Sequence, residues 1–331
     1  MKLPRFGLTM GDPNGIGPEI IIKAIHQLQP LTSWKPLVFG DLSVLQEVNA
    51  MLGNPLQFCE FNKLSPSPES VSVLNLAVSE NRQWQPGKRC AWGGESSFVF
   101  LTEAIRWAMN NEISAIVTAP LCKEAMHEAG HFYPGHTEIL SLQTNQALPV
   151  MMLVVDELRA IHVTTHMPLK EAIASLTIER ILKVISIADK TLRQMGIQNP
   201  KFGIPGLNPH ASENGLFGEE EREIIIPAIE EAEKQGIDCR GPVSPDVIFL
   251  QHREGIFDAV IALYHDQAHI PLKLLGFERG VNVTLGLPVI RTSVDHGTAF
   301  DRAALFQSDP SSMIHAIRFA QRLVSNHSAL I

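Results

Sequence analysis

The stretch FGLTMGDPNGIGPEIIIKAIHQL, residues 6–28, joins a short apolar run to a segment with the spacing of an amphipathic helix through a glycine-rich turn. Its glycines do not follow the G-x-G-x-x-G order of a Rossmann fingerprint. A Walker loop requires the sequence G-K-[ST] at the start of its helix, and this chain has Gly17, Pro18 and Glu19 there instead. Gly15 and Gly17 permit a tight turn, and Pro18 suits the first position of a helix. The stretch therefore predicts a strand, a structural turn and a helix.

Short β-prone runs alternate with helical patterns along the whole chain. The β-prone runs are PLVFG, VSVLNLAV, SAIVTAP, VMMLVVD, RAIHVTT, KFGIPGLN and DAVIALY. Helical patterns include ESSFVFLTEAIRWAMNN, EEREIIIPAIEEAEKQG and residues 177–195, where apolar side chains recur with a period near 3.6. This alternation predicts an α/β protein with a largely parallel sheet. A chain of 331 residues favours two lobes with a cleft, and residues 62–70 (NKLSPSPES) are expected to form a surface loop.

Composition excludes several classes of protein. The formal charge of −8 gives no support for nucleic-acid binding. Apolar runs fall far short of the roughly 20 residues that a membrane span needs, and no secretory h-region is visible, so we expect a cytoplasmic protein. The four cysteines form no C-x-x-C pair, which argues against a disulfide framework or a thiolate zinc site.

Three histidines share one sequence context. LRAIHVTTH ends at His166, PKFGIPGLNPH at His210 and FDAVIALYH at His265, each just beyond a β-prone run. The carboxyl ends of parallel strands open onto the ligand crevice, so these imidazoles can converge on a catalytic divalent metal. Surface or capping positions are the structural alternative.

Two further histidines raise an ambiguity. His162 precedes His166 by four residues, but the β-branched residues 163–165 oppose a helix there. In an extended strand the two side chains would lie about 13 Å apart, which makes His166 the better ligand. His265 and His269 show the same spacing, and Asp266 is a third candidate beside them.

Three other polar segments are candidates for a site: the first is a polar cluster or only a capped turn, and the other two suit an anion. YPGHTEI, residues 133–139, follows a Pro-Gly turn with residues that can open a helix. Lys273, Asn282 and Arg291 recur at nine-residue intervals and suit a phosphate or carboxylate, unless they are ordinary surface residues. TSVDHGTAFDRAA, residues 292–304, offers backbone N–H groups at a Gly-Thr entry into a helix.

Taken together, these motifs resemble one family over nearly the whole chain, the 4-hydroxythreonine-4-phosphate dehydrogenases. The motifs are GDPNGIGPE, TAPLCKEAM, AGHFYPGHTE, TTHMPLK, GLNPHASENGLFGEEE, YHDQAHIPLK and GVNVTLGLPVIRTSVDHGTA. The resemblance implies a two-lobed fold of the isocitrate and isopropylmalate dehydrogenase type, with mostly parallel sheets, and a homodimer with shared active sites. It places residues 1–125 and 273–331 in a first lobe on the cofactor side. Residues 126–272 would form a second lobe with the metal ligands and the dimer interface.

The resemblance also implies roles for individual residues. His166, His210 and His265 match the family's metal ligands, which come from both protomers. The loop VDHGTAFD matches the segment that holds NAD or NADP. The substrate-binding positions are His136, Thr137, Lys273, Asn282 and Arg291, and the cofactor-binding positions are Asp295, His296, Gly297 and Thr298.

The implied activity is NAD-dependent oxidation and decarboxylation of a 4-phosphorylated four-carbon hydroxy acid, assisted by zinc, magnesium, manganese or cobalt. The metal would lower the pKa of the substrate hydroxyl, favour hydride transfer and stabilise the enolate left as carbon dioxide departs. Lys273 and Arg291 would anchor anionic groups. The catalytic candidates are Lys273 and Asp246, the latter as a proton carrier or an orienter of the metal site.

Three positions depart from the family pattern and bear on the geometry of the active site, and other motifs point to one of two branches. Ser212 stands where glycine is common, Cys122 where asparagine or histidine is common, and SPDVIF differs from the usual PADTxF. KEAM, YPGHTEIL, NPHASENGLFG and HIPLKLLGF look closer to the branch that oxidises D-threonate or D-erythronate 4-phosphate than to the branch of pyridoxal phosphate biosynthesis. The two substrates differ by a hydroxyl or an amino group at C2. An inactive metal- or metabolite-binding relative and a metal-dependent hydrolase remain the alternatives from other classes.

Overall fold

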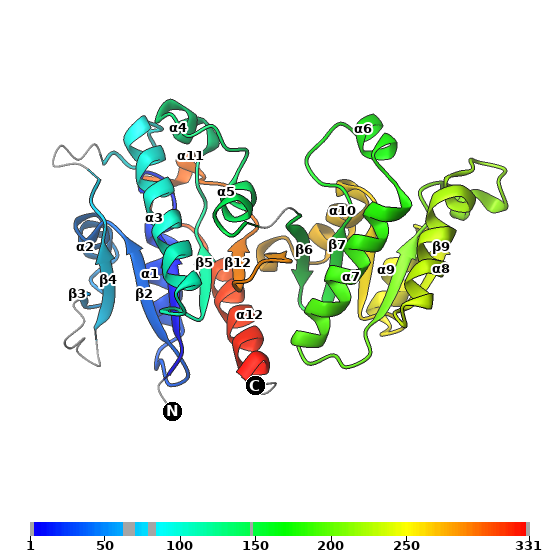
Figure 1. Ribbon diagram of the computed structural model, residues 1–331. Helices are drawn as coiled ribbons and strands as arrows, with labels where there is room; N and C mark the ends of the chain where they lie inside the picture. The colour runs from blue at the N-terminus through cyan, green and yellow to red at the C-terminus, as the bar shows by residue number, and fades with distance from the viewer. Residues whose placement is uncertain (1–2, 62–69, 79–83, 146–147, 329–331) are drawn as a thin grey trace. The chain divides into compact units, whose positions relative to one another are not determined.

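The computed structural model describes residues 3–61, 70–78, 84–145 and 148–328 (Figure 1). Its contacts divide the chain into two compact units. Unit 1 consists of Met1–Pro149 and Leu287–Val324, and unit 2 of Val150–Gly286 and Ser325–Ile331. The predicted α/β class is confirmed, whereas residues 62–69 of the predicted surface loop lie outside the described residues.

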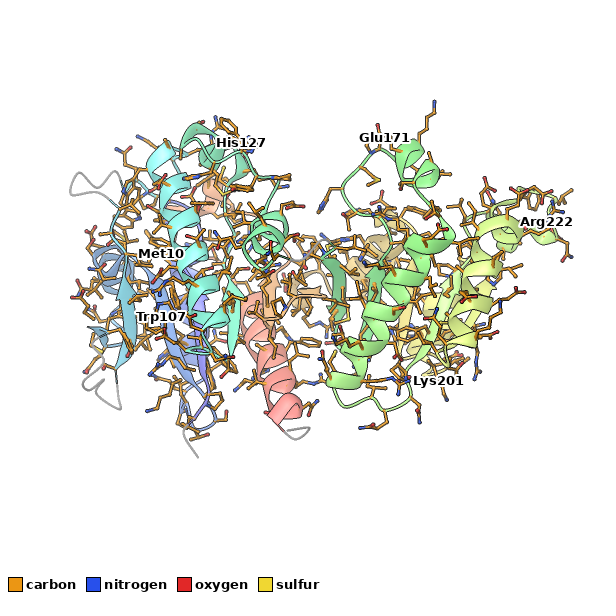
Figure 2. All side chains as sticks on the ribbon, in the orientation of Figure 1. Met10, Trp107, His127, Glu171, Lys201 and Arg222 are labelled. Carbon is orange, nitrogen blue, oxygen red and sulfur yellow. The ribbon has the colours of Figure 1, made fainter. Side chains whose placement is uncertain are left out.

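Unit 1 is built on a parallel sheet with the strand order β3-β4-β2-β1-β5-β12. Its strands are β1 (Arg5–Thr9), β2 (Lys35–Gly40), β3 (Phe58–Glu60), β4 (Val71–Asn75), β5 (Ala115–Thr118) and β12 (Arg291–Val294). Its helices are α1 (Gly17–Gln27), α2 (Leu42–Met51), α3 (Ala91–Met109), α4 (Lys123–Glu128), α5 (His136–Gln143), α11 (Phe300–Ala303) and most of α12 (Ser311–Ser328). Met10 and Trp107 are buried inside this unit (Figure 2).

Unit 2 contains a mixed sheet with the order β11-β6-β7-β10-β8-β9, in which β6 is antiparallel to both of its neighbours. Its strands are β6 (Val150–Val155), β7 (Leu158–His162), β8 (Lys201–Pro205), β9 (Asp238–Val243), β10 (Ala259–Ala262) and β11 (Val281–Leu285). Its helices are α6 (Leu169–Ala174), α7 (Ile178–Gln194), α8 (Ile226–Lys234), α9 (Ile248–Arg253) and α10 (His265–Gly276), with 3₁₀ turns at Pro209–Glu213 and Phe277–Arg279 and a π turn at Glu221–Ile225. Figure 1 shows α7 in front of this sheet and α10 behind it.

The unit boundaries lie later in the chain than the sequence suggests. Residues 126–149 belong to unit 1 because α4 and α5 pack against α3. Residues 273–286 belong to unit 2 because β11 pairs with β6, with Asn282 opposite Leu153. Helix packing thus sets the first boundary and strand pairing sets the second, and no local pattern reveals either.

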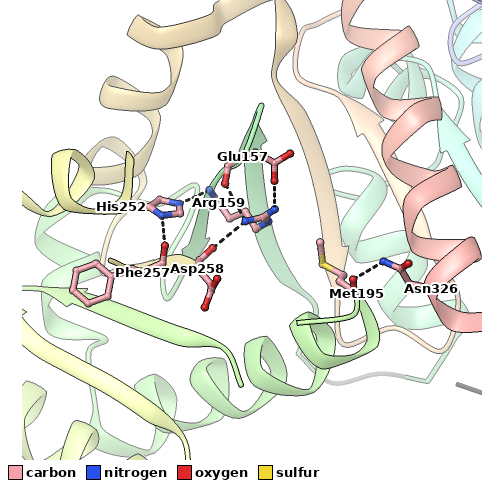
Figure 3. Close-up of polar contacts among 7 residues, drawn as sticks. All are labelled: Glu157, Arg159, Met195, His252, Phe257, Asp258 and Asn326. Atoms are coloured by element: carbon pink, nitrogen blue, oxygen red, sulfur yellow. Dashed lines mark hydrogen bonds and ion pairs between the residues drawn. The ribbon is translucent and has the colours of Figure 1, made fainter. Parts of the chain in front are cut away.

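A buried polar network supports unit 2 (Figure 3). His252 donates from Nδ1 to the carbonyl of Phe257 at 2.8 Å and accepts at Nε2 from the backbone N–H of Arg159 at 2.7 Å. The Arg159 guanidinium donates to the carbonyl of Asp258 at 3.2 Å and to the carboxylate of Glu157 at 2.7 Å. Burial lowers the pKa of His252, which fits the neutral imidazole that this bonding pattern requires. The network therefore ties α9 to the starts of β7 and β10.

The turn between β1 and α1 is packed too tightly for side chains at two of its glycines. A Cβ at Gly17 would lie 2.1 Å from the carbonyl oxygen of Met10, and one at Gly15 would lie 2.9 Å from that of Thr298. The N–H of Ile16 donates to that same Thr298 carbonyl at 3.0 Å. The glycines thus let the turn pack against Met10 and Thr298, and α1 begins at Gly17, one residue before the predicted start at Pro18.

Asp12, in the same turn, is fully buried. Its Oδ1 accepts from the N–H of Asn14 at 3.0 Å, while Oδ2 has no partner among the described residues. Burial raises the pKa of Asp12 to about 7, so the carboxyl group stays protonated in the folded state where the unfolded chain has already ionised it. The contribution of Asp12 to the free energy of unfolding is therefore largest at pH values below the unfolded-state pKa, and it is lost as the pH rises toward 7.

We predict that Asp12→Asn, which carries no titratable proton, removes a pH-dependent loss of stability between about pH 4 and 7. The free energy of unfolding of the wild type should fall relative to that of the variant by up to about 4 kcal/mol over this range, measured by urea unfolding at a series of pH values. The exposed Asp301→Asn is the matched control and should keep the wild-type slope. Equal slopes in wild type and Asp12→Asn would contradict the prediction.

Candidate active site

The three predicted metal-ligand histidines follow three neighbouring parallel strands. In unit 2, β10 pairs in parallel with β7 on one side and β8 on the other. His166 follows β7, His265 begins α10 just after β10, and His210 follows β8. All three therefore lie beyond the carboxyl ends of their strands, where α/β sheets bind ligands.

His166 and His265 form a pair. Their ring centroids are 5.3 Å apart. Nδ1 of His265 lies 2.6 Å from Oδ1 of Asp266, which leaves Nε2 for a ligand. A carboxylate on the far nitrogen is the usual partner of a metal-bound imidazole. The pair can therefore supply two nitrogen ligands from one chain.

His210 lies in a turn of unusual conformation. Residues 210–214 all have positive φ values, between 45° and 65°, a region that side chains other than glycine adopt at a cost. The carboxylate of Glu221, which is 1% exposed, anchors the start of this turn by accepting from the N–H groups of Leu207 and Asn208 at 2.8 Å each. Ser212 has a φ of 65°, so a glycine at this position would adopt the conformation more easily.

The predicted histidine triad is not assembled by one chain. Among the residues that the structure describes, no three His, Cys, Asp or Glu side chains are grouped so that they could hold a metal ion. His210 instead neighbours the exposed Asp246. The pKa of Asp246 lies below its usual range, mainly because the Ser244 hydroxyl donates to it at 2.6 Å and further because of the nearby His210.

His162 and His269 join the pair, which corrects the sequence-based interpretation. β7 ends at His162, so residues 162–166 are not an extended strand, and the rings of both His162 and His166 lie beside His265. Burial is the main cause that lowers the pKa of His162 to about 4 and that of His269 to about 3. Four imidazoles therefore cluster in unit 2.

Two of the predicted substrate residues lie near this histidine cluster. Lys273 is on α10, and its positive charge is one of the causes that lower the pKa of His269. Asn282, on β11, donates to the Met151 sulfur at 3.3 Å, and the carbonyl of Met151 contacts Nδ1 of His162. Lys273, Asn282 and the histidines thus belong to one side of unit 2.

A second cluster, called here the cation cluster, lies in unit 1 and consists of the cations Arg291 and Lys123 around the neutral imidazole of His136. Arg291, at the start of β12, is 2% exposed and donates to the Thr118 hydroxyl at 2.7 Å. Burial lowers the pKa of Arg291 to about 9, while the charge of Glu138 opposes the shift, so the guanidinium remains positive at neutral pH. The pKa of His136 lies well below its usual range because of burial first and the charge of Arg291 second. Such a cluster favours an anionic ligand.

Lys123 is the member that sequence reasoning missed. It begins α4, its charge also lowers the pKa of His136, and its Cε lies 3.6 Å from a Cβ placed on Gly135. The motif TAPLCKEAM contains it, but local spacing does not connect it with His136. Cys122, just before it, is a buried thiol whose pKa burial raises to about 11, so this departure places a neutral group beside the cluster.

The predicted cofactor loop is part of the same unit. Asp295, His296, Gly297 and Thr298 connect β12 to α11, which is a helix of one turn only. The N–H of Asp295 donates to the Ser312 hydroxyl at 3.3 Å, and Thr298 lies against the turn of Gly15 and Ile16. Arg291 lies at the start of β12, and the other end of that strand leads directly into this loop. The predicted substrate residue Thr137 lies elsewhere in unit 1, in the first turn of α5, which begins at His136.

Fold and sites together define an α/β protein with a buried arginine beside His136 in one unit and a histidine cluster in the other. The family model described as Pyridoxal phosphate biosynthetic protein PdxA matches residues 32–320, and the chain belongs to this family. The D-threonate 4-phosphate dehydrogenase of Pectobacterium atrosepticum is 43% identical to it, over 96% of this chain and 98% of that protein. The 4-hydroxythreonine-4-phosphate dehydrogenase of Beijerinckia indica is 44% identical, over 96% and 94%. The crystal structure of 4-hydroxythreonine-4-phosphate dehydrogenase from Klebsiella pneumoniae aligns with a TM-score of 0.90 at 42% identity, covering 97% and 98% of the two chains.

We predict that Glu221→Ala destabilises the turn that carries His210. Two backbone N–H groups lose a charged acceptor, which should reduce the free energy of unfolding by roughly 3 kcal/mol in urea. Glu220→Ala is the control, because the Glu220 carboxylate accepts from the side chain of Asn208 and from the backbone of Glu219 and Glu220, whereas Leu207 and Asn208 donate their backbone N–H groups to Glu221; the loss should be less than about 1 kcal/mol. Similar losses in the two variants would show that the turn does not depend on Glu221.

Proposed function

We propose that the chain is an NAD(P)-dependent dehydrogenase that, with a divalent metal, oxidises and decarboxylates a 4-phosphorylated four-carbon hydroxy acid. The observation that carries the proposal is the buried positive charge of Arg291, which like that of Lys123 acts on His136 and which β12 joins to the VDHGTA loop. Relatives named as dehydrogenases of two such phosphorylated acids support it. Use of NAD rather than NADP and a cytoplasmic location stay predictions.

The cation cluster provides the charge that the substrate phosphate or carboxylate needs. Placing a guanidinium in the interior costs free energy unless an anion compensates it. Arg291 can bind two oxygens at once, whereas Lys123, which is exposed, adds a mobile charge. Together with Thr137, these residues would orient an anionic group next to the cofactor loop.

His166 and His265 would hold the metal from one chain, with His210 of a second chain as the third ligand. When bound, a divalent metal lowers the pKa of a ligated hydroxyl and stabilises the enolate formed on decarboxylation. Lys273 and Asn282 would hold the substrate near the histidines. Asp246 would orient His210, because its carboxylate is the anion beside that imidazole.

An exposed apolar face on α10 supports a homodimer with shared sites. Ile270 and Leu274, one turn apart on α10, are 66% and 85% exposed, and Phe277 just beyond is 64% exposed. Large apolar side chains grouped on one helix face indicate an interface. The same helix carries His265, so a second copy packed there would bring its own residues close to the metal ligands.

We predict that Leu274→Glu converts the protein to a monomer and lowers its affinity for Zn²⁺ or Co²⁺ by about tenfold or more, since a charge would be buried and the shared ligand lost. Light scattering coupled to size exclusion gives the mass, and metal titration gives the affinity. Met51→Glu, at an equally apolar exposed position on α2, is the control and should leave both unchanged. A Leu274→Glu dimer with full affinity would rule out this interface.

For the activity we predict metal-dependent formation of NADH from D-threonate 4-phosphate or 4-hydroxy-L-threonine 4-phosphate. The ratio of the kcat/KM values for these two substrates shows to which branch of the family the chain belongs. 4-Hydroxy-L-threonine 4-phosphate is the substrate of the branch of pyridoxal phosphate biosynthesis. Arg291→Lys should raise the KM for the phosphorylated acid about tenfold or more without changing the KM for NAD, because lysine cannot bind two oxygens at once. The exposed Arg318→Lys should match the wild type. No turnover of either acid by protein that binds metal and NAD would exclude both substrates.

A further inference from the structure

His269 is enclosed between two other histidine rings. It lies one helical turn after His265 on α10 and stacks on it, with centroids 3.8 Å apart and ring planes 8° apart. On another side His162 lies 5.1 Å away with its ring tilted by 54°. His269 is 6% exposed, so these neighbours and the surrounding core fix its position.

His162, the tilted ring beside His269, is anchored to the sheet. His162 is the last residue of β7 and is 2% exposed. Its Nδ1 donates to the carbonyl of Met151 at 3.2 Å, on the neighbouring strand β6. A rotation of His162 would break this hydrogen bond in the protein interior, where it is costly to lose. The support behind His269 is therefore rigid.

His269 contributes a flat face rather than hydrogen bonds. Neither of its ring nitrogens has a hydrogen-bond partner among the described residues. On the other side of the stack, His265 is held at Nδ1 by Asp266 at 2.6 Å. One hydrogen bond at the edge and one stacking contact on the face together restrict rotation of the His265 ring.

We propose that His269, backed by His162, is a positioning residue that holds the His265 imidazole in the orientation required of a metal ligand. The inference rests on the proposed function, because it takes His265 as a ligand. A ligand ring that is already fixed does not have to be ordered when the metal binds, so the stack raises metal affinity without touching the metal.

The test compares two variants that both lack the nitrogens. His269→Phe keeps a flat ring, whereas His269→Leu is apolar but not flat. Co²⁺ is titrated into each protein, and its visible absorption reports the ligand geometry while competition with a chelator reports the affinity. His269→Phe should keep the wild-type spectrum and affinity, whereas His269→Leu should lose about tenfold in affinity and shift the absorption bands.

Three results would overturn the proposal. Wild-type behaviour of His269→Leu would mean that the stack has no role, and an equal loss in both variants would assign the effect to the ring nitrogens. His252→Leu removes a buried histidine of the same unit outside the stack and should lower the unfolding temperature without changing Co²⁺ affinity. If it weakens Co²⁺ binding as much as His269→Leu, the effect is general destabilisation.

Two further arms complete the test. If His269→Leu does not fold, the pair His162→Leu and His162→Phe asks the same question one ring further from His265. Failure of the wild type to bind Co²⁺ at all would instead contradict the proposed metal site, so the two failures are distinguishable.

Discussion

The backbone hydrogen bonds of β10 are the interaction on which the histidine cluster depends. β10 pairs in parallel with β7 and with β8, so three segments that are far apart in sequence end side by side. Because the strands run in the same direction, the residues that follow them emerge at one edge of the sheet. A strand placed between β7 and β10 would separate His166 from His265.

A corresponding constraint operates in unit 1. β5 pairs in parallel with β12, which brings Arg291 from the end of the chain next to Thr118. The buried guanidinium is then close enough to His136 to lower the pKa of that imidazole. At the other end of β12, the loop of residues 295–298 rests on the opening turn, where the two glycines leave no room for side chains. In unit 1, strand pairing, the Arg291–Thr118 hydrogen bond and the contact of Thr298 with the opening turn thus join distant parts of the chain.

Much of the fold follows from local chemistry. The spacing of residues 177–195 matches α7, whose N-cap Thr177 accepts from the N–H of Arg180. Each β-prone run identified in the sequence corresponds to a strand, because runs of Val, Ile and aromatic residues fit a buried pleated surface. The unit boundaries could not be predicted from local sequence, because they depend on which strands pair and on the packing of α4 and α5 against α3.

The sequence by itself determined the α/β class, the structural nature of the glycine-rich turn and the motifs that resemble the family. These are properties of neighbouring residues, whose spacing can be read along the chain. Only the tertiary structure brought Lys123 to His136 and enclosed His269 between His162 and His265. It also placed His210 on a left-handed turn apart from the other histidines. Such contacts depend on strand order and on where a strand ends, and burial then sets the charge state of the groups that meet.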